Sequence, residues 1–244
     1  MEFFRIDLHV HTALSACASD DMMPRHIVQM AVLEGIHLLA ITDHNSALNC
    51  RAVADAAEGL SVKVLAGIEV QTREEVHVLT LFPSPDAVDV WQEQLMRVLP
   101  KVPHRPELFG QQLHFEPGDA APHPHPWLLQ QSVEMSLTKV EQVCHSLGGL
   151  FIPAHINRQS FGLLGQLGVI PDGLRYDGLE ILARKGSELG SYGPRIMNSD
   201  AHTLEDLILP SAEQTWLYAE EPTFDELARG LAGVQGRRVV IGRP

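Results

Sequence analysis

The sequence predicts an α/β protein with a single domain over residues 1–244, built as a distorted, TIM-like (β/α)7 barrel. Two observations carry this prediction. Short apolar runs that suit buried strands alternate with amphipathic segments that suit helices, and seven such runs begin before residue 200. The third and fourth runs are joined only by residues 71–74, too few for a crossover helix. The barrel is therefore expected to be distorted there or to contain an antiparallel pair.

The predicted strands are short runs rich in Val, Ile, Leu and Phe that end in polar residues. The run at 37–42 is apolar throughout, which is typical of a parallel strand buried on both faces. The seven strands are predicted at 3–12, 37–42, 63–70, 75–82, 150–155, 178–183 and 195–200. Two further short apolar runs follow at 214–219 and 239–242.

The predicted helices have an apolar repeat close to 3.6 residues and recognisable ends. Pro24 suits a first helical turn and Gly35 marks the end of the same helix, while Gly148 and Gly149 end a later one. The helices are predicted at 25–35, 47–59, 86–99, 137–147 and 223–231, with a loop and short helix at 158–168.

Residues 100–131 break this alternation. The stretch is rich in proline and contains Pro-His-Pro-His-Pro at 122–126, so we interpret it as an insertion or long loop and a candidate lid. The spacing of His123 and His125 imitates a pair of metal ligands, but alternating prolines favour an extended, solvated chain. We therefore expect no permanent metal site in this segment.

Charge and cysteine content narrow the classes of function. With 18 Lys and Arg against 31 Asp and Glu, the net charge of −13 argues against strong binding of duplex nucleic acid or acidic membranes. Cys17, Cys50 and Cys144 are odd in number and widely spaced, which indicates a reducing compartment. No apolar run approaches the ~18 residues of a membrane span, and no targeting segment is evident. We expect a cytoplasmic protein.

Ligand-type residues follow or end almost every predicted strand. In a parallel barrel the carboxyl ends of the strands share one face, which is where active sites lie. Imidazoles mixed with carboxylates suit divalent transition metals such as zinc, manganese or iron. The residues are His9, His11, Asp43, His44, Glu69, His77, His155, Glu180, Asp200 and His202.

Several of these positions together resemble a known family. Asp7-Leu8-His9-Val10-His11-Thr12, Thr42-Asp43-His44, Gly67-Ile68-Glu69, Ala154-His155 and Ser199-Asp200-Ala201-His202 resemble the motifs of the polymerase and histidinol phosphatase (PHP) family. The resemblance implies a metal-dependent phosphoesterase on a distorted (β/α)7 barrel with three divalent metal ions. It also implies that the part from about residue 195 corresponds to the PHP-associated segment.

Carried over position by position, the resemblance assigns the metal ligands. His9, His11 and Asp200 would hold the first metal, and Glu69 would bridge it to a second held by His77 and His155. His44 and His202 would hold the third metal with Asp20, for which Asp21 is the alternative. An aspartate there, instead of a histidine soon after His11, resembles the branch of nucleoside-bisphosphate and AMP phosphatases more than histidinol phosphatase.

The same resemblance implies hydrolysis by a hydroxide that bridges metals, because divalent cations lower the pKa of bound water toward ~7. Asp43 is expected to orient a ligand or pass a proton, and its alternative role is a structural cap after the strand. Arg158 and Arg184, with Lys185 as a neighbour, are the candidates for binding phosphate. Glu180 is expected to hydrogen-bond a ligand histidine or the substrate.

The expected substrate is a small phosphate monoester, nucleotides included. Three alternatives remain: an exonuclease or oligonucleotidase acting on short nucleic acids, a metal-binding PHP module with little turnover, and an amidohydrolase. Amidohydrolase barrels also open with His-x-His, but they commonly need a strand-end lysine or a late lone aspartate, and neither pattern is visible here. The metal identity (Mn, Zn or Fe) and the oligomeric state stay open.

Overall fold

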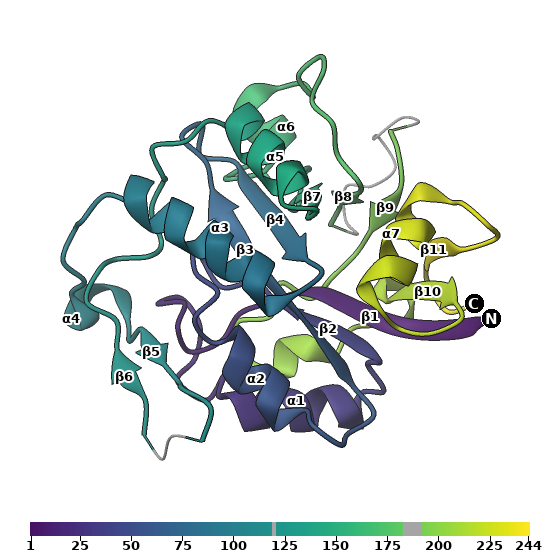
Figure 1. Ribbon diagram of the computed structural model, residues 1–244, viewed down its shortest axis with the longest axis horizontal. Helices are drawn as coiled ribbons and strands as arrows, with labels where there is room; N and C mark the ends of the chain where they lie inside the picture. Colours follow the sequence, from purple (N-terminus) through teal and green to yellow (C-terminus); the bar gives the residue numbers. More distant parts are fainter. Residues whose placement is uncertain (119–120, 183–191) are drawn as a thin grey trace.

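A mixed seven-stranded sheet forms the centre of the computed structural model, which describes residues 1–118, 121–182 and 192–244 (Figure 1). The strands follow the order β11-β10-β1-β2-β3-β4-β7, and only β1–β2 and β2–β3 are parallel. Their bounds are β1 Glu2–Val10, β2 Leu38–Ile41, β3 Lys63–Gln71, β4 His77–Phe82, β7 Leu150–Pro153, β10 Thr215–Ala219 and β11 Arg238–Ile241.

The sheet curls into a half-barrel, and a separate parallel pair, β8 (Leu179–Glu180) with β9 (Arg195–Ile196), lies between β7 and β10. Asp177, just before β8, donates its backbone N–H to the carbonyl of Phe151 in β7. Met197, just after β9, donates its backbone N–H to the hydroxyl of Thr215 in β10. Of the predicted (β/α)7 barrel, the described residues contain the parallel part β1–β2–β3 with its two helices, and antiparallel strands follow it.

The antiparallel neighbour expected after the third strand is confirmed. Gln71 pairs with His77 across a tight turn, and β3 and β4 pair as far as Ala66 and Phe82. The short link prevents a crossover, so β4 runs opposite to β1, β2 and β3. The first residue of β4 therefore lies at the edge of the sheet where those three strands end.

Helices cover the outer face of the half-barrel, while α7 (Phe224–Ala232) packs against β10 and β11 (Figure 1). The outer helices and the strands share one apolar core, which contains Ile27, Val53, Trp91 and Val140. The other helices are α1 Pro24–Leu33, α2 Cys50–Ala56, α3 Pro85–Val98, α4 Pro106–Phe109, α5 Leu137–Ser146 and α6 Leu163–Leu167, and two 3₁₀ turns occupy Leu204–Leu207 and Ser211–Glu213. Within the described residues, no helix combines the length and apolarity needed to cross a membrane.

A β-bulge divides β1 into two parts with opposite side-chain directions. Asp7 pairs with Leu39 and Val10 with Ile41, so β1 holds one more residue than β2 over this interval. Before the bulge, Ile6 and Leu8 belong to the inner apolar cluster with Leu79 and Leu81 of β4 and Leu227 of α7. After it, Val10 belongs to the outer core. The side chains at positions 9 and 11 therefore lie on the inner face.

The described part of the segment 100–131, predicted as an insertion, lies beside the sheet and contains α4 and a small hairpin of β5 (Leu113–His114) and β6 (His123–Pro124). It is anchored to the loop after β1, because Leu113 donates its backbone N–H to the carbonyl of Ala13 at 2.7 Å. Asn49 donates in turn to the carbonyl of Leu113. His123 and His125 are in none of the metal-capable groups found among the described residues.

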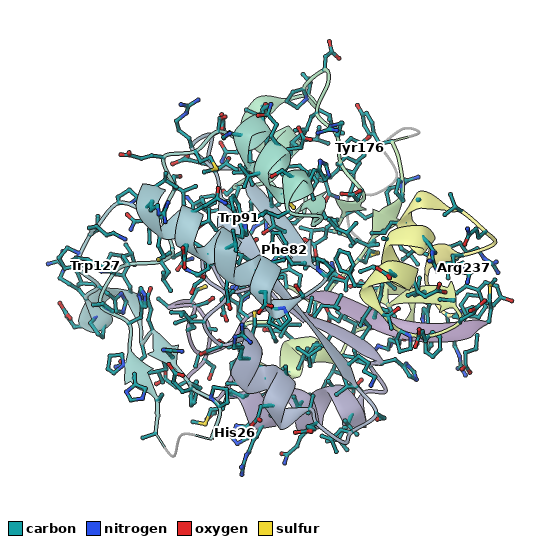
Figure 2. All side chains as sticks on the ribbon, in the orientation of Figure 1. His26, Phe82, Trp91, Trp127, Tyr176 and Arg237 are labelled. Atoms are coloured by element: carbon teal, nitrogen blue, oxygen red, sulfur yellow. The ribbon has the colours of Figure 1, made fainter. Side chains whose placement is uncertain are left out.

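Trp91 should contribute most to the attachment of α3. Its ring, labelled in Figure 2, is fully buried between α3 and the sheet and donates its indole N–H to Thr80 at 3.0 Å. Trp91→Ala leaves a cavity and removes the indole hydrogen bond to Thr80, whose hydroxyl still donates to the carbonyl of Ile68, so we expect a loss of about 3–5 kcal/mol in the free energy of unfolding. Urea unfolding measures it. The matched control is Val90→Ala, because Val90 is 48% exposed on the same helix, and an equal loss in both variants would contradict this packing.

Candidate metal centre

Imidazoles and carboxylates from seven parts of the chain meet at one end of the half-barrel. The parallel strands supply His9 and Glu69 directly and His44 just after β2, while His77 comes from the start of the antiparallel β4. A parallel bridge between Val10 and Ala201 sets Asp200 and His202 beside His9 and His11. The remaining contributors, His155 and Glu180, follow β7 and end β8.

Glu69 is the centre of this group, and it is only 1% exposed. One of its oxygens, Oε1, lies 3.2 Å from Nε2 of His9, 2.9 Å from Nδ1 of His77 and 3.3 Å from Nε2 of His155. The other, Oε2, lies 2.8 Å from Nδ1 of His44 and 3.5 Å from Nε2 of His11. A single buried carboxylate thus contacts five imidazoles.

Asp200 supplies a second carboxylate at the mouth. Its Oδ1 lies 3.2 Å from Nε2 of His9 and 3.3 Å from Nε2 of His11, and its Oδ2 lies 3.3 Å from the guanidinium of Arg158. Asp200 has a φ of 50° and His155 a φ of 27°, a region that L-residues seldom adopt. Two ligand-type residues are therefore held in uncommon backbone conformations, as is frequent at functional sites.

The group fits divalent cations because several buried nitrogen and oxygen atoms lack a hydrogen-bond partner. These atoms are Nδ1 of His44, Oε2 of Glu69, Nε2 of His77 and Nδ1 of His155. His44 Nδ1 and Glu69 Oε2 are 2.8 Å apart, yet their geometry forms no hydrogen bond. Unpaired buried polar atoms are costly, and converging lone pairs are what a metal ion requires.

Among the described residues there are three sets of ligand atoms, and the atoms of each set all lie within 4.8 Å of one another. Imidazole and carboxylate sets of this kind suit zinc, manganese or iron better than magnesium. The sets are His9, His11 and Glu69; His44, Glu69 and His77; and His11, His44 and His202.

An outer layer of hydrogen bonds orients the imidazoles. Both oxygens of Glu180 lie 3.0–3.1 Å from Nδ1 of His9, and Asn198 donates to the same carboxylate at 2.7 Å. Ser15 lies 3.0 Å from Nδ1 of His11. With the Nδ1 atoms engaged, Nε2 of both histidines is left to face the centre. Of the two roles expected for Glu180, the geometry matches the hydrogen bond to a ligand histidine.

Asp43 is buried and fully engaged by the loop that follows β1. One oxygen accepts from the backbone N–H of Thr12 at 2.8 Å and from the hydroxyl of Ser15 at 2.7 Å. The other oxygen accepts from the hydroxyl of Thr12 at 2.7 Å. These contacts make Asp43 an anchor for the loop that orients His11.

The remaining predicted residues differ in where they lie. Arg158 is at the mouth with its side chain 43% exposed, whereas Arg184 and Lys185 are outside the described residues. Asp20 and Asp21 are exposed and belong to none of the three sets among the described residues, so the ligand role of Asp20 stays a prediction.

Cys17 was not predicted at this site, although it lies in the same loop, six residues after His11. Cys17 is exposed, and its thiol lies near the imidazoles of His202 and His44. Partial burial raises the pKa of this thiol, but the interactions with the two imidazoles together outweigh it and lower the pKa to about 7. A cysteine alone in a polar loop carries no spacing signal, so only the folded loop reveals its neighbours.

The buried charges compensate one another without metal. Burial lowers the pKa of His44, but the charge of Glu69 at 2.8 Å and the neighbouring thiol of Cys17 outweigh it and raise the pKa to about 10. The pKa of His9 is raised well above its usual value, since the charges of Glu180, Asp200 and Glu69 exceed the opposing effect of burial. Burial and the neighbouring His44 and His202 instead lower the pKa of His11 to about 3, although Asp200 opposes this.

Divalent metal should stabilise the fold through Glu69. At about 100 times the dissociation constant, a bound metal adds about 2.7 kcal/mol to the free energy of unfolding. Glu69→Gln should abolish most of this gain because it removes the shared ligand. Thermal unfolding with and without Mn²⁺ or Zn²⁺ measures the metal-dependent shift. Glu58→Gln, an exposed carboxylate elsewhere, should keep the full shift, and an unchanged shift in Glu69→Gln would refute the assignment.

Metal binding should tighten as pH rises. At pH ~7 the raised pKa values keep His9 and His44 protonated in the metal-free protein, and a metal must displace these protons. Each displaced proton makes the observed affinity rise by about tenfold per pH unit below the pKa of that histidine. Calorimetry in buffers of different ionisation enthalpy counts the released protons. Affinity that is flat between about pH 6 and about pH 8 would contradict the protonated state.

Comparison with known proteins agrees with this geometry. The PHP domain family matches residues 7–145 of the chain. The chain is 25% identical over 275 aligned residues to the uncharacterized protein YqxK of Bacillus subtilis, covering 96% of this chain and 63% of YqxK. It is 34% identical over 80 residues to the phosphoribosyl 1,2-cyclic phosphate 1,2-diphosphodiesterase of Eggerthella lenta, covering 31% of this chain and 29% of that enzyme.

Among solved structures, the lesion-specific endonuclease PfuEndoQ of Pyrococcus furiosus superposes with a TM-score of 0.75 at 20% identity, covering 98% of this chain and 58% of the endonuclease. At this identity the likeness concerns the fold. The chain thus spans about three fifths of YqxK and of PfuEndoQ. The family match covers more than half of the chain and includes His9, His11, His44, Glu69 and His77, so the chain belongs to the PHP domain family, whose members are metal-dependent hydrolases.

Proposed function

We propose that this chain is a metal-dependent phosphoesterase. The observation that carries the proposal is the set of buried nitrogen and oxygen atoms without hydrogen-bond partners around Glu69, because a divalent cation can bind such atoms. The family match and the phosphodiesterase relative support the same chemistry.

We propose three metal positions, assigned by the resemblance to the family motifs. His9, His11 and Asp200 would hold the first metal, and Glu69 would share it with a second at His77 and His155. His44 and His202 would hold the third. When bound, divalent cations supply positive charge that polarises a phosphate ester and acidifies water.

The protein's own groups orient the site and bind the substrate. Arg158 is the candidate for a phosphate oxygen, because its guanidinium lies at the mouth and, among the residues that the structure describes, pairs with one carboxylate, that of Asp200. Glu180 and Ser15 keep His9 and His11 in one tautomer and orientation. Asp43 holds Ser15 and Thr12, so we assign it a positioning role. Arg184 keeps its proposed phosphate-binding role.

We propose a small phosphate monoester, nucleotides included, as the substrate. A surface of net charge −13 repels an extended polyanion, whereas a small ester needs only the positive charge supplied at the mouth. The proposed aspartate-type branch of the family, with its nucleoside-bisphosphate and AMP phosphatases, agrees with this choice.

A second candidate is a phosphodiesterase that acts on nucleic acid. The specific observation in its favour is the likeness in fold to a lesion-specific endonuclease over 98% of this chain. Because the chain spans only 58% of that endonuclease, contacts to a long DNA duplex would have to come from elsewhere.

One substrate panel separates the two candidates. With Mn²⁺ or Zn²⁺ added, we expect hydrolysis of p-nitrophenyl phosphate, AMP or a nucleoside bisphosphate, and slower or no cleavage of DNA duplexes carrying an abasic site. Asp200→Asn should lower kcat/KM by more than about 100-fold, because it weakens the proposed metal ligand that lies beside both His9 and His11. Preferred cleavage of the damaged duplex would favour the second candidate.

The control variant for this experiment is Asp172→Asn, an exposed carboxylate in a loop, which should retain wild-type rates. Absence of hydrolysis with every ester, in wild-type protein that binds metal, would overturn the phosphoesterase proposal.

A further inference from the structure

Among the described residues, none hydrogen-bonds with the ring of His77 from outside the centre of the site. The Nδ1 of His77 lies 2.9 Å from Oε1 of Glu69, and its Nε2 is buried without a hydrogen-bond partner. His9 differs, because Glu180 engages its Nδ1 and leaves Nε2 to face the centre. The outer side-chain torsion of histidine is soft, so packing must fix the plane of the His77 ring.

The ring of Phe161 lies flat against His77. Their centroids are 4.6 Å apart and their planes differ by 16°, which is the geometry of a stacked pair. The backbones are joined as well, since His77 donates its N–H to the carbonyl of Phe161 at 2.9 Å. The imidazoles of His44 and His155 are also close to His77, but their planes are inclined to it by 64° and 56°.

Phe161 is held against His77 by a tight turn in an uncommon backbone conformation. Its φ is 62°, a region that bulky L-residues rarely adopt. The turn leaves no room for a side chain at Gly162, where a Cβ would lie 2.3 Å from the carbonyl oxygen of Arg158 and 2.7 Å from that of His155. The turn therefore determines where the ring of Phe161 lies.

Filling of the apolar core does not explain this conformation. Phe161 is half-buried, and it belongs to neither the outer core nor the inner apolar cluster of the described residues. Backbone conformations of this kind cost free energy and are concentrated at functional sites. The neighbour that the ring covers is His77, a member of the ligand set with His44 and Glu69.

We propose that Phe161 is a positioning residue that fixes the ring of His77 for metal binding. This inference rests on the proposed metal-dependent function. The flat face of Phe161 restricts rotation of the imidazole without occupying either of its nitrogens. A lone pair of His77 therefore stays available to the set that it forms with His44 and Glu69. Stacking thus does for His77 what the carboxylate of Glu180 does for His9.

Zn²⁺ affinity in matched variants tests this role without enzyme activity. Phe161→Leu keeps an apolar side chain but removes the flat face, and should weaken Zn²⁺ binding by about 10- to 100-fold. Phe161→Tyr keeps the ring and should bind Zn²⁺ as tightly as wild type. The control is Phe109→Leu, because Phe109 is 45% exposed beside His104, which belongs to no metal-capable set among the described residues. Competition with a chelator measures the affinity.

A double-mutant cycle assigns the effect to His77. In a His77→Ala background, Phe161→Leu should cause no further loss of Zn²⁺ affinity, because the two side chains act as a unit. Equal losses in both backgrounds would overturn the proposal, as would an equal loss in Phe161→Tyr and Phe161→Leu. Thermal unfolding of the metal-free proteins shows which variants are folded. Phe161→Met, another flexible apolar side chain, replaces Phe161→Leu if that variant is unfolded.

The outcomes separate this inference from the proposed function. Wild-type Zn²⁺ affinity in folded Phe161→Leu, in a protein that binds Zn²⁺ and hydrolyses phosphate esters, would overturn the role of Phe161 alone. Failure of the wild type to bind Zn²⁺ would overturn the metal-dependent function and this inference together.

Discussion

The buried charge of Glu69 is the constraint on which the mouth of the half-barrel depends. A carboxylate that is 1% exposed is strongly unfavourable unless it is paired, and five imidazoles from four parts of the chain surround this one. Without metal, the raised pKa values of His9 and His44 let protons supply the charge. Metal ions can therefore enter by exchange with protons, in a site whose side chains are already gathered.

Much of this arrangement could be predicted from residue patterns. Period and composition located nearly every strand and helix, and the polar residues at strand ends identified the imidazoles and carboxylates that converge. The short link at 71–74 also predicted the antiparallel β4, whose reversed direction explains why His77, at the start of a strand, reaches residues at the ends of others. These features are local, and local signals are what a sequence pattern records.

Other features depend on contacts between distant segments and could not be predicted. The bulge in β1 appears only in its register with β2, and the pairing of Ala201 with Val10 joins residues 191 positions apart. The neighbourhood of Cys17 depends on how Ser19 meets His202, which no spacing within the loop encodes. The antiparallel β10 and β11, which extend the sheet beyond β1, likewise follow from tertiary pairing.

The bulge in β1 also separates two kinds of physical requirement along one strand. Residues before it, such as Ile6 and Leu8, need only fill apolar volume, and many side chains of similar size meet that need. Residues after it, His9 and His11, must keep both chemical identity and direction. Because one extra residue sets the two parts out of phase, the apolar side chains before it and the imidazoles after it face the same side of the sheet. A single strand thus contributes to the inner apolar cluster and to the candidate metal centre on one face.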